Sequence, residues 1–251
     1  MIKKATSGFP SQAFDELSKQ EDSSWWFLSR NQIIIWAIKK YAANFKDFLE
    51  IGCGTGFVLQ AIDRTFPGNN LFGDEYFEEG LEHAKKRLPA ASFRCLDATQ
   101  MQDQDRYDAI GAFDVIEHIE DDKLVLLRCF QALKKDGFLF LTVPQHMWLW
   151  SSVDEYSCHV RRYSSLELMQ KVEQAGFQVM TSSSFISLLV PLMWLSRKRL
   201  SQKKEESMTE LKPSSWLNIF FKMVMKVEIM LLKLGAKFPI GGSLILVAKK
   251  L

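Results

Sequence analysis

The sequence has few cysteines, and they form no pattern typical of a disulfide framework or a zinc site. Its 251 residues include four cysteines, at positions 53, 95, 129 and 158, and no C-x-x-C pair. Cys53 lies in a glycine-rich turn and Cys95 in a predicted strand, so we expect buried thiols rather than disulfide bridges. This usage predicts a reducing compartment, which we take to be the cytoplasm, and no metal site.

Long apolar runs and strong net charge are also lacking. No uninterrupted apolar run reaches the roughly 18 residues of a membrane-spanning helix, and the polar start of the chain predicts no signal peptide. The net charge is only +2, without the concentrated basic face of a nucleic-acid binder. The motifs H-E-x-x-H and G-x-S-x-G are absent, so zinc-protease and serine-hydrolase functions lack support.

The sequence is organised around one strand, turn and helix near residue 50. The apolar run 48–51 ends in three glycines at alternate positions, and apolar residues follow at helical spacing. Glycines suit a sharp turn that a ligand approaches closely. Dinucleotide sites read G-x-G-x-x-G, whereas this turn reads G-x-G-x-G after Glu50, an acid that would repel a pyrophosphate. The ligand indicated is a nucleoside with a cationic amino-acid tail.

This segment resembles motif I of the class I S-adenosylmethionine-dependent methyltransferases. The resemblance implies S-adenosylmethionine as cofactor and a Rossmann-like α/β fold. That fold has a seven-stranded, mostly parallel sheet with helices on both faces, an antiparallel last strand and a helical cap insertion. The near-continuous apolar strands that alternate with helices argue separately for a covered parallel sheet. The turn residues implied in cofactor binding are Glu50, Gly52, Cys53, Gly54 and Gly56.

Three further positions match the family in the same order along the chain. An acid after the second strand, 70–75, chelates the ribose hydroxyls in such folds, and both Asp74 and Glu75 could do so. Family sequences read glycine, apolar residue, acid, which favours Glu75 and leaves Asp74 in a usually apolar position. The resemblance also implies cofactor contacts by Tyr76, by Asp97 and Ala98 at the adenine, and by Phe113 and Asp114 near the sulfonium. Asp97 could instead cap a turn.

Three histidines are candidates for catalysis. His118 follows the fourth strand, while His146 and His159 lie in segment 145–163, which leaves the end of the fifth strand where α/β sheets bind ligands. A general base is needed only if the acceptor presents a protonated alcohol or amine. His118 could instead form a polar wall of the pocket. Arg161 and Arg162 fit a structural role, tying this segment to the body of the protein.

We predict three parts of the chain: an N-terminal helical lid, 1–47; a methyltransferase core, 48–185 with 242–251; and a hydrophobic helical insertion, 186–241. The insertion either caps the acceptor pocket or contacts a membrane surface through residues 186–234, with the basic cluster 197–199 near anionic lipid. Either arrangement favours an apolar acceptor.

The predicted function is methyl transfer from S-adenosylmethionine to an apolar or lipid-linked small molecule, in the cytoplasm or at a membrane. One alternative is an NAD-dependent oxidoreductase, which Glu50 and the glycine spacing disfavour. The other is a nucleotide-binding protein without catalysis, which would bind the cofactor but methylate no acceptor. No nucleic-acid partner is predicted.

Overall fold

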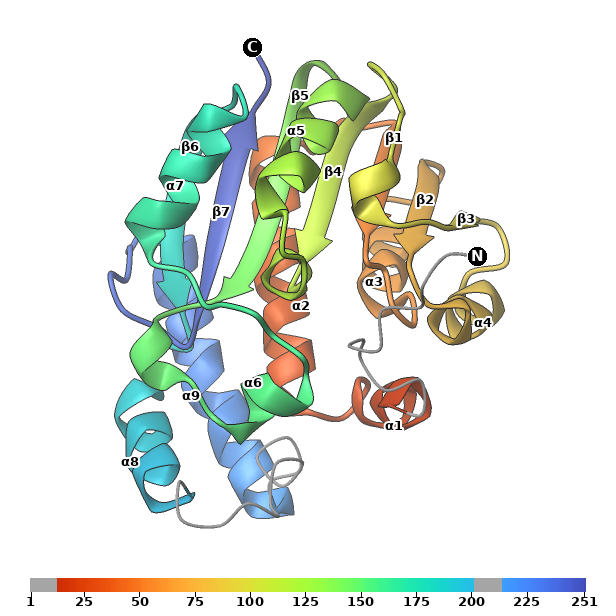
Figure 1. Cartoon of the computed structure of the whole chain (residues 1–251). Coiled ribbons are helices and arrows are strands. Elements are labelled where there is room, and N and C mark those ends of the chain that lie inside the picture. The colour runs from red at the N-terminus through yellow and green to blue at the C-terminus, as the bar shows by residue number, and fades with distance from the viewer. Residues whose placement is uncertain (1–12, 201–213) are drawn as a thin grey trace.

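A computed structural model describes residues 13–200 and 214–251, which form one seven-stranded sheet flanked by helices (Figure 1). The strand order is β3-β2-β1-β4-β5-β7-β6. The strands are β1 (Asp47–Ile51), β2 (Asn70–Glu75), β3 (Ser92–Cys95), β4 (Tyr107–Phe113), β5 (Leu133–Pro144), β6 (Gln178–Phe185) and β7 (Ser243–Lys249).

The sheet is parallel through its first five strands and antiparallel at its last. Leu49 of β1 lies opposite Phe72 of β2 on one side and Ile110 of β4 on the other, both in parallel register. β7 runs antiparallel between β5 and β6. The predicted fold class is therefore confirmed. Because the order reverses between β1 and β4, a crevice is expected outside the carboxyl ends of these strands.

Helices cover both faces of the sheet because successive side chains of a strand point to opposite sides. Phe48 packs in the core that includes α2 and α3, whereas Leu49 packs in the core under α5 and α7. The α-helices are α1 (Ala13–Gln20), α2 (Trp25–Tyr41), α3 (Phe57–Thr65), α4 (Glu78–Arg87), α5 (Asp122–Ala132), α6 (Ser152–Tyr156), α7 (Ser165–Gln174), α8 (Val190–Leu200) and α9 (Ser215–Lys233). Short 3-10 helices are η1 (Ala98–Gln100), η2 (Ile116–His118) and η3 (Met147–Leu149).

The two helices of the predicted insertion lie beyond the carboxyl edge of the parallel strands, in the lower part of Figure 1 with α1 and α6. α9 packs on α2: the Trp25 N–H donates to Asn218 Oδ1 (2.8 Å), and the Trp25 and Phe221 rings meet at 5.2 Å. In 13–200 and 214–251, none of the helices has both the length and the apolarity to span a bilayer. The division into lid, core and insertion stays a prediction.

One expectation about the cysteines is wrong. Cys53 is buried under the glycine turn, as expected, but Cys95 is exposed. β3 is the edge strand of the sheet and is only partly covered, so a residue in it need not be buried.

Candidate functional site

A cavity of about 1390 Å³ opens at the carboxyl ends of β1, β2 and β4. Its walls come from the glycine turn, the ends of these strands, and residues of α1, α2, α6, α8 and α9. A pocket for one small ligand usually measures about 300–1,000 Å³. This cavity therefore has room for a nucleoside cofactor and an acceptor side by side.

The three glycines of the turn have different tasks, although each adopts a positive φ (63°, 53° and 76°). A Cβ on Gly52 would come within 2.5 Å of Val115, and one on Gly56 within 3.1 Å of the Ala84 backbone. At Gly54 the nearest atom would be 3.9 Å away, because this residue faces the cavity. Gly54 thus leaves room for a ligand, whereas Gly52 and Gly56 leave room for neighbouring protein atoms.

The two acids at the end of β2 have separate surroundings. Both oxygens of Asp74 accept from the Arg94 guanidinium (2.7 and 2.6 Å). Glu75 lines the cavity and accepts from the backbone N–H groups of Gly54 (2.8 Å) and Phe77 (3.0 Å). Burial raises the pKa of both carboxyls. Glu75 is therefore the acid placed to meet a ligand, and Asp74 belongs to an ion pair behind it.

Charged groups gather where an amino-acid tail would lie. Glu50 is buried, its Oε2 has no hydrogen-bond partner in the described chain, and burial raises its pKa well above the usual range. Arg30 donates to Asp114 Oδ2 (2.5 Å), and its guanidinium lies 4.6 Å from the centre of the Trp26 ring. Asp114 itself has a left-handed backbone (φ 57°), which an aspartate tolerates better than most residues.

The remaining predicted cofactor residues also line the cavity, with one exception. Asp97 caps η1 by accepting hydrogen bonds from the Thr99 N–H and hydroxyl (both 2.8 Å). Asp97 and the preceding Leu96 both line the cavity. All predicted cofactor residues except Gly56 border the cavity: Glu50, Gly52, Cys53, Gly54, Glu75, Tyr76, Asp97, Ala98, Phe113 and Asp114.

Two of the three predicted catalytic histidines come together at this cavity. The rings of His118, in η2, and His159, after α6, meet edge to face with centres 4.6 Å apart. Burial, and then the neighbouring His159, lower the pKa of His118 to about 4. His146 does not border the cavity and instead stacks on Trp148, 5.3 Å between ring centres.

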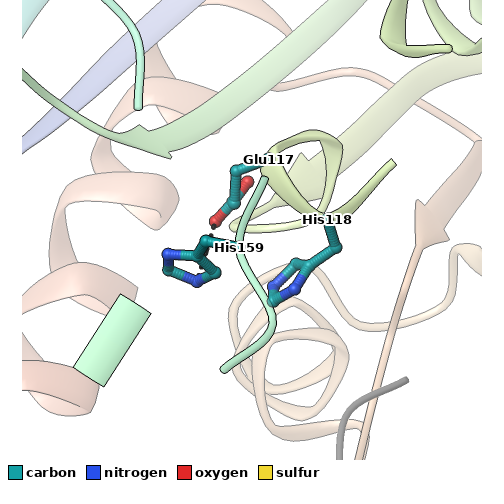
Figure 2. Close-up of side chains that lie close together, drawn as sticks. All are labelled: Glu117, His118 and His159. Carbon is teal, nitrogen blue, oxygen red and sulfur yellow. Dashed lines mark ion pairs between the residues drawn. The ribbon is translucent and has the colours of Figure 1, made fainter. Parts of the chain in front are cut away.

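Glu117 lies in the site, although it was not among the residues predicted from the sequence. Its side chain is fully buried, borders the cavity and lies 4.0 Å from His159 Nε2 (Figure 2). Neither carboxylate oxygen has a hydrogen-bond partner within the described ranges. Burial, and then the charge of Asp114, raise its pKa well above the usual range. An acid next to His118 was a visible signal, but the proximity of His159 was not.

A rigid arrangement of polar groups holds His159 in place. Asp154 Oδ1 contacts His159 Nδ1 (2.8 Å), and the Arg162 guanidinium donates hydrogen bonds to both oxygens of Asp154 (2.7 and 2.9 Å). Arg161 pairs with Asp122 at 2.8 Å. The two arginines therefore have the structural role expected of them, tying segment 145–163 to the rest of the chain.

One part of the cavity lining is mainly apolar. It comes from α2 and from the helices and adjoining loop of the predicted insertion, and comprises Trp25, Trp26, Ile186, Leu189, Leu192, Met193, Leu217 and Phe221. The lining of the cavity thus combines the polar strand ends with a set of apolar helix and loop residues.

The strand order, the glycine turn and the cavity define a Rossmann-like protein of the nucleoside-binding class. The chain belongs to the methyltransferase-domain family, whose model matches residues 27–182, and within it to the class I S-adenosylmethionine-dependent methyltransferases. The predicted family resemblance is therefore confirmed.

Curated relatives support the same family. A protein of Mycolicibacterium smegmatis named "Probable S-adenosylmethionine-dependent methyltransferase" is 26% identical over 63% of this chain and 61% of its own length. A ubiquinone biosynthesis O-methyltransferase of Bradyrhizobium diazoefficiens is 28% identical over 40% of each chain. The chain thus spans about two-fifths to three-fifths of these relatives. A methyltransferase structure from Thermotoga maritima shares the fold (TM-score 0.60, 17% identity, 96% of this chain and 95% of that one).

Proposed function

We propose that the chain binds S-adenosylmethionine and transfers its methyl group to a small acceptor with a sizeable apolar part. The observation that carries the proposal is the mixed lining of one cavity: Gly54 and Glu75 border it together with apolar residues of α8 and α9. Family membership supports the cofactor. The volume supports simultaneous binding of two molecules.

The cofactor would lie against the glycine turn. Glu75 would accept from the ribose hydroxyls, and Asp97 with the Ala98 backbone would contact the adenine. The buried Glu50 and the Arg30–Asp114 pair lie where the ammonium and carboxylate of the methionine part would bind. Glu50 Oε2, which lacks a hydrogen-bond partner within 13–200 and 214–251, supports a bound ammonium because an unpaired buried carboxylate is unstable.

The reaction would be an in-line displacement. A nucleophile of the acceptor forms a bond to the methyl carbon, the carbon–sulfur bond breaks, and its electron pair stays on sulfur, which turns the sulfonium into a thioether. The sulfonium is an activated donor, so the protein contributes mainly alignment. His118 and His159 both border the cavity, and we propose that they contact the nucleophilic group. His146 has no contact that supports a catalytic role.

An apolar or lipid-linked acceptor is the finer part of this proposal. The name of the Bradyrhizobium relative, a ubiquinone biosynthesis O-methyltransferase, supports a small-molecule acceptor. The apolar wall from α8 and α9 supports an acceptor that buries hydrocarbon or aromatic surface there.

Contact with an anionic membrane surface would bring a lipid-linked acceptor to this wall. α9 exposes an apolar stripe: Trp216, Ile219, Phe220, Met223, Val227 and Met230. The acid of this helix, Glu228, is buried and accepts from the Ser187 and Leu188 N–H groups (both 2.8 Å), so its outer face carries lysines without carboxylates. The side chains of residues 198–200 lie outside the described part, so the cluster 197–199 adds no argument.

Sedimentation with lipid vesicles tests the membrane contact. The protein should sediment more with phosphatidylcholine vesicles that contain phosphatidylserine than with phosphatidylcholine alone. Ile219→Asn should lower the bound fraction several-fold, because burial of this apolar side chain is lost. Leu127→Asn, which changes an exposed leucine on α5, is the control. Equal sedimentation of both variants and the unmodified protein would contradict the contact.

Two measurements test the activity. Titration calorimetry should show binding of S-adenosylmethionine, while NADH fluorescence should stay unchanged on mixing. Incubation with radiolabelled S-adenosylmethionine and fractionated lipid and small-molecule extracts should label a product in an apolar fraction. Binding without label in any fraction would favour the non-catalytic alternative, and an NADH response would favour the oxidoreductase.

A further inference from the structure

The histidine pair and Glu117 form a cluster with the composition of a metal site. One carboxylate oxygen of Glu117 and one ring nitrogen each of His118 and His159 all lie within 4.8 Å of one another. Figure 2 shows the Glu117 carboxylate directed at His159, which lies on a neighbouring segment, while His118 comes from the same segment as Glu117. All three residues border the cavity.

The Glu117 carboxylate is an independent indication that a ligand is needed here. It is fully buried, and neither oxygen has a hydrogen-bond partner in the described ranges. The charged groups that face it are Asp114, which repels it, and Arg30, Arg162 and His159, which attract it. Arg30 is already bonded to Asp114 and Arg162 to Asp154. A buried carboxylate without a partner is costly, and a cation between Glu117 and His159 would remove that cost.

The surroundings of His159 are those of a metal-ligating histidine. The second ring nitrogen of such a histidine usually hydrogen-bonds to a carboxylate, which fixes the ring and its tautomer. At His159, Asp154 is the carboxylate that contacts Nδ1 (2.8 Å). Asp154 in turn accepts hydrogen bonds from Arg162 and from the Ser151 N–H (2.8 Å). This leaves His159 Nε2 on the side of Glu117, at 4.0 Å.

We propose that Glu117, His118 and His159 bind one divalent transition-metal cation in the lining of the cavity. Two imidazoles and one carboxylate are typical ligands of Zn²⁺, and also of iron and related ions. With protein–metal distances of about 2.0–2.2 Å, small side-chain rotations would close the cluster on the ion. Three protein ligands leave a coordination position open toward the cavity, as in catalytic rather than structural sites.

The cation would act on an acceptor oxygen, an inference that rests on the proposed methyl transfer. A cation-bound hydroxyl loses its proton to water more readily. The resulting oxygen then forms the O–CH₃ bond while the carbon–sulfur bond breaks toward sulfur. The acceptor class indicated is therefore a phenol, alcohol or other oxygen nucleophile with an apolar body.

Metal titration of the full chain tests the site directly. Protein stripped with a chelator and dialysed should bind one equivalent of Co²⁺, with visible absorption bands, and one of Zn²⁺ by calorimetry. Glu117→Gln and His159→Ala should each weaken binding by about 100-fold or more, since even loss of a supporting group costs about 10–100-fold. His83→Ala, on α4 and outside the cluster, should bind as the unmodified protein does. Failure to bind Co²⁺ and Zn²⁺, or unchanged binding by Glu117→Gln, would overturn the proposal.

Thermal unfolding separates the metal site from a simple Glu117–His159 ion pair. Glu117→Gln keeps the size of the buried side chain and removes its carboxyl group. Zn²⁺ should raise the unfolding temperature of the unmodified protein but not of the variant. An unfolding temperature of the unmodified protein that Zn²⁺ leaves unchanged would favour the ion pair and overturn the proposal. S-adenosylmethionine affinity, measured on the same samples, tests the proposed function separately.

Discussion

The two walls of the cavity are built in different ways. The wall to which we assign the cofactor, here called the cofactor wall, consists of short segments at the ends of adjacent parallel strands, 50–54, 75–76, 97–98 and 113–114. The wall to which we assign the acceptor, here called the acceptor wall, consists of residues of α8 and α9 with Trp25 and Trp26 of α2. It keeps some exposure; Leu192, for example, is 44% exposed. Hydrogen-bonded strand register fixes the first wall, while side-chain packing and a few side-chain hydrogen bonds, such as that from the Trp25 N–H to Asn218, fix the second. Substitutions should therefore affect the two walls independently, which three experiments can test.

The largest effect is expected at Gly54. Gly54→Val should lower S-adenosylmethionine affinity by roughly 100-fold or more, because its side chain would occupy the space that the ligand approaches. The positive φ adds about 1–2 kcal/mol of strain. Gly68→Val is the matched control: Gly68 also has a positive φ (84°), but a Cβ there meets no atom within 4 Å, and it lies away from the cavity. Unchanged calorimetric affinity in Gly54→Val would contradict the prediction.

A smaller effect on affinity should separate the neighbouring acids of β2. Glu75→Gln should weaken S-adenosylmethionine binding by about 1–3 kcal/mol, roughly 5–150-fold, because a buried charged acceptor of hydrogen bonds is lost. Asp74→Asn should leave affinity within about twofold but lower unfolding stability by about 1–3 kcal/mol through the Arg94 pair. Calorimetry and urea unfolding measure the two quantities. The assignment fails if Asp74→Asn loses the ligand and Glu75→Gln keeps it.

The smallest effect is expected on the acceptor wall. Leu192 and Leu195 both lie on α8 and are 44% and 42% exposed, but only Leu192 borders the cavity. Leu192→Ser should raise the KM for the acceptor found in the radiolabel screen about fivefold, because about 1 kcal/mol of apolar burial is lost. Leu195→Ser should not, and neither change should alter S-adenosylmethionine affinity. Equal KM values for the two variants would place the acceptor elsewhere.

The cofactor wall was predictable because its signals are local. The turn glycines, the acids Glu75 and Asp97, and the end of β4 each follow an apolar strand, and parallel strands bring these ends to one edge. The role of Gly56 was not predictable, because it depends on the approach of Ala84 from another helix. The choice between Asp74 and Glu75 came from the family pattern, and the Arg94 contact supplies its physical reason.

The sequence did not distinguish the three histidines. His118, His146 and His159 were equal candidates, and only the packing of segment 145–163 separates them: the Val160 N–H donates to the Glu117 carbonyl (2.8 Å) and brings His159 to η2. The same packing turned His146 toward Trp148 and left Glu117 facing two imidazoles. The proposed metal site was not predicted, because His159 lies far in the sequence from the adjacent Glu117 and His118.

The sequence by itself determined the class of the fold and the half of the cavity that a nucleoside would occupy, since strand periodicity and glycine turns act over a few residues. The tertiary structure alone decided that His118 and His159 contact each other, that Glu117 has no hydrogen-bond partner in the described chain, and that α8 and α9 line the cavity. Those features depend on contacts between segments that are far apart in the chain. Only tertiary contacts, both apolar packing and the polar contacts of segment 145–163, fix their distances.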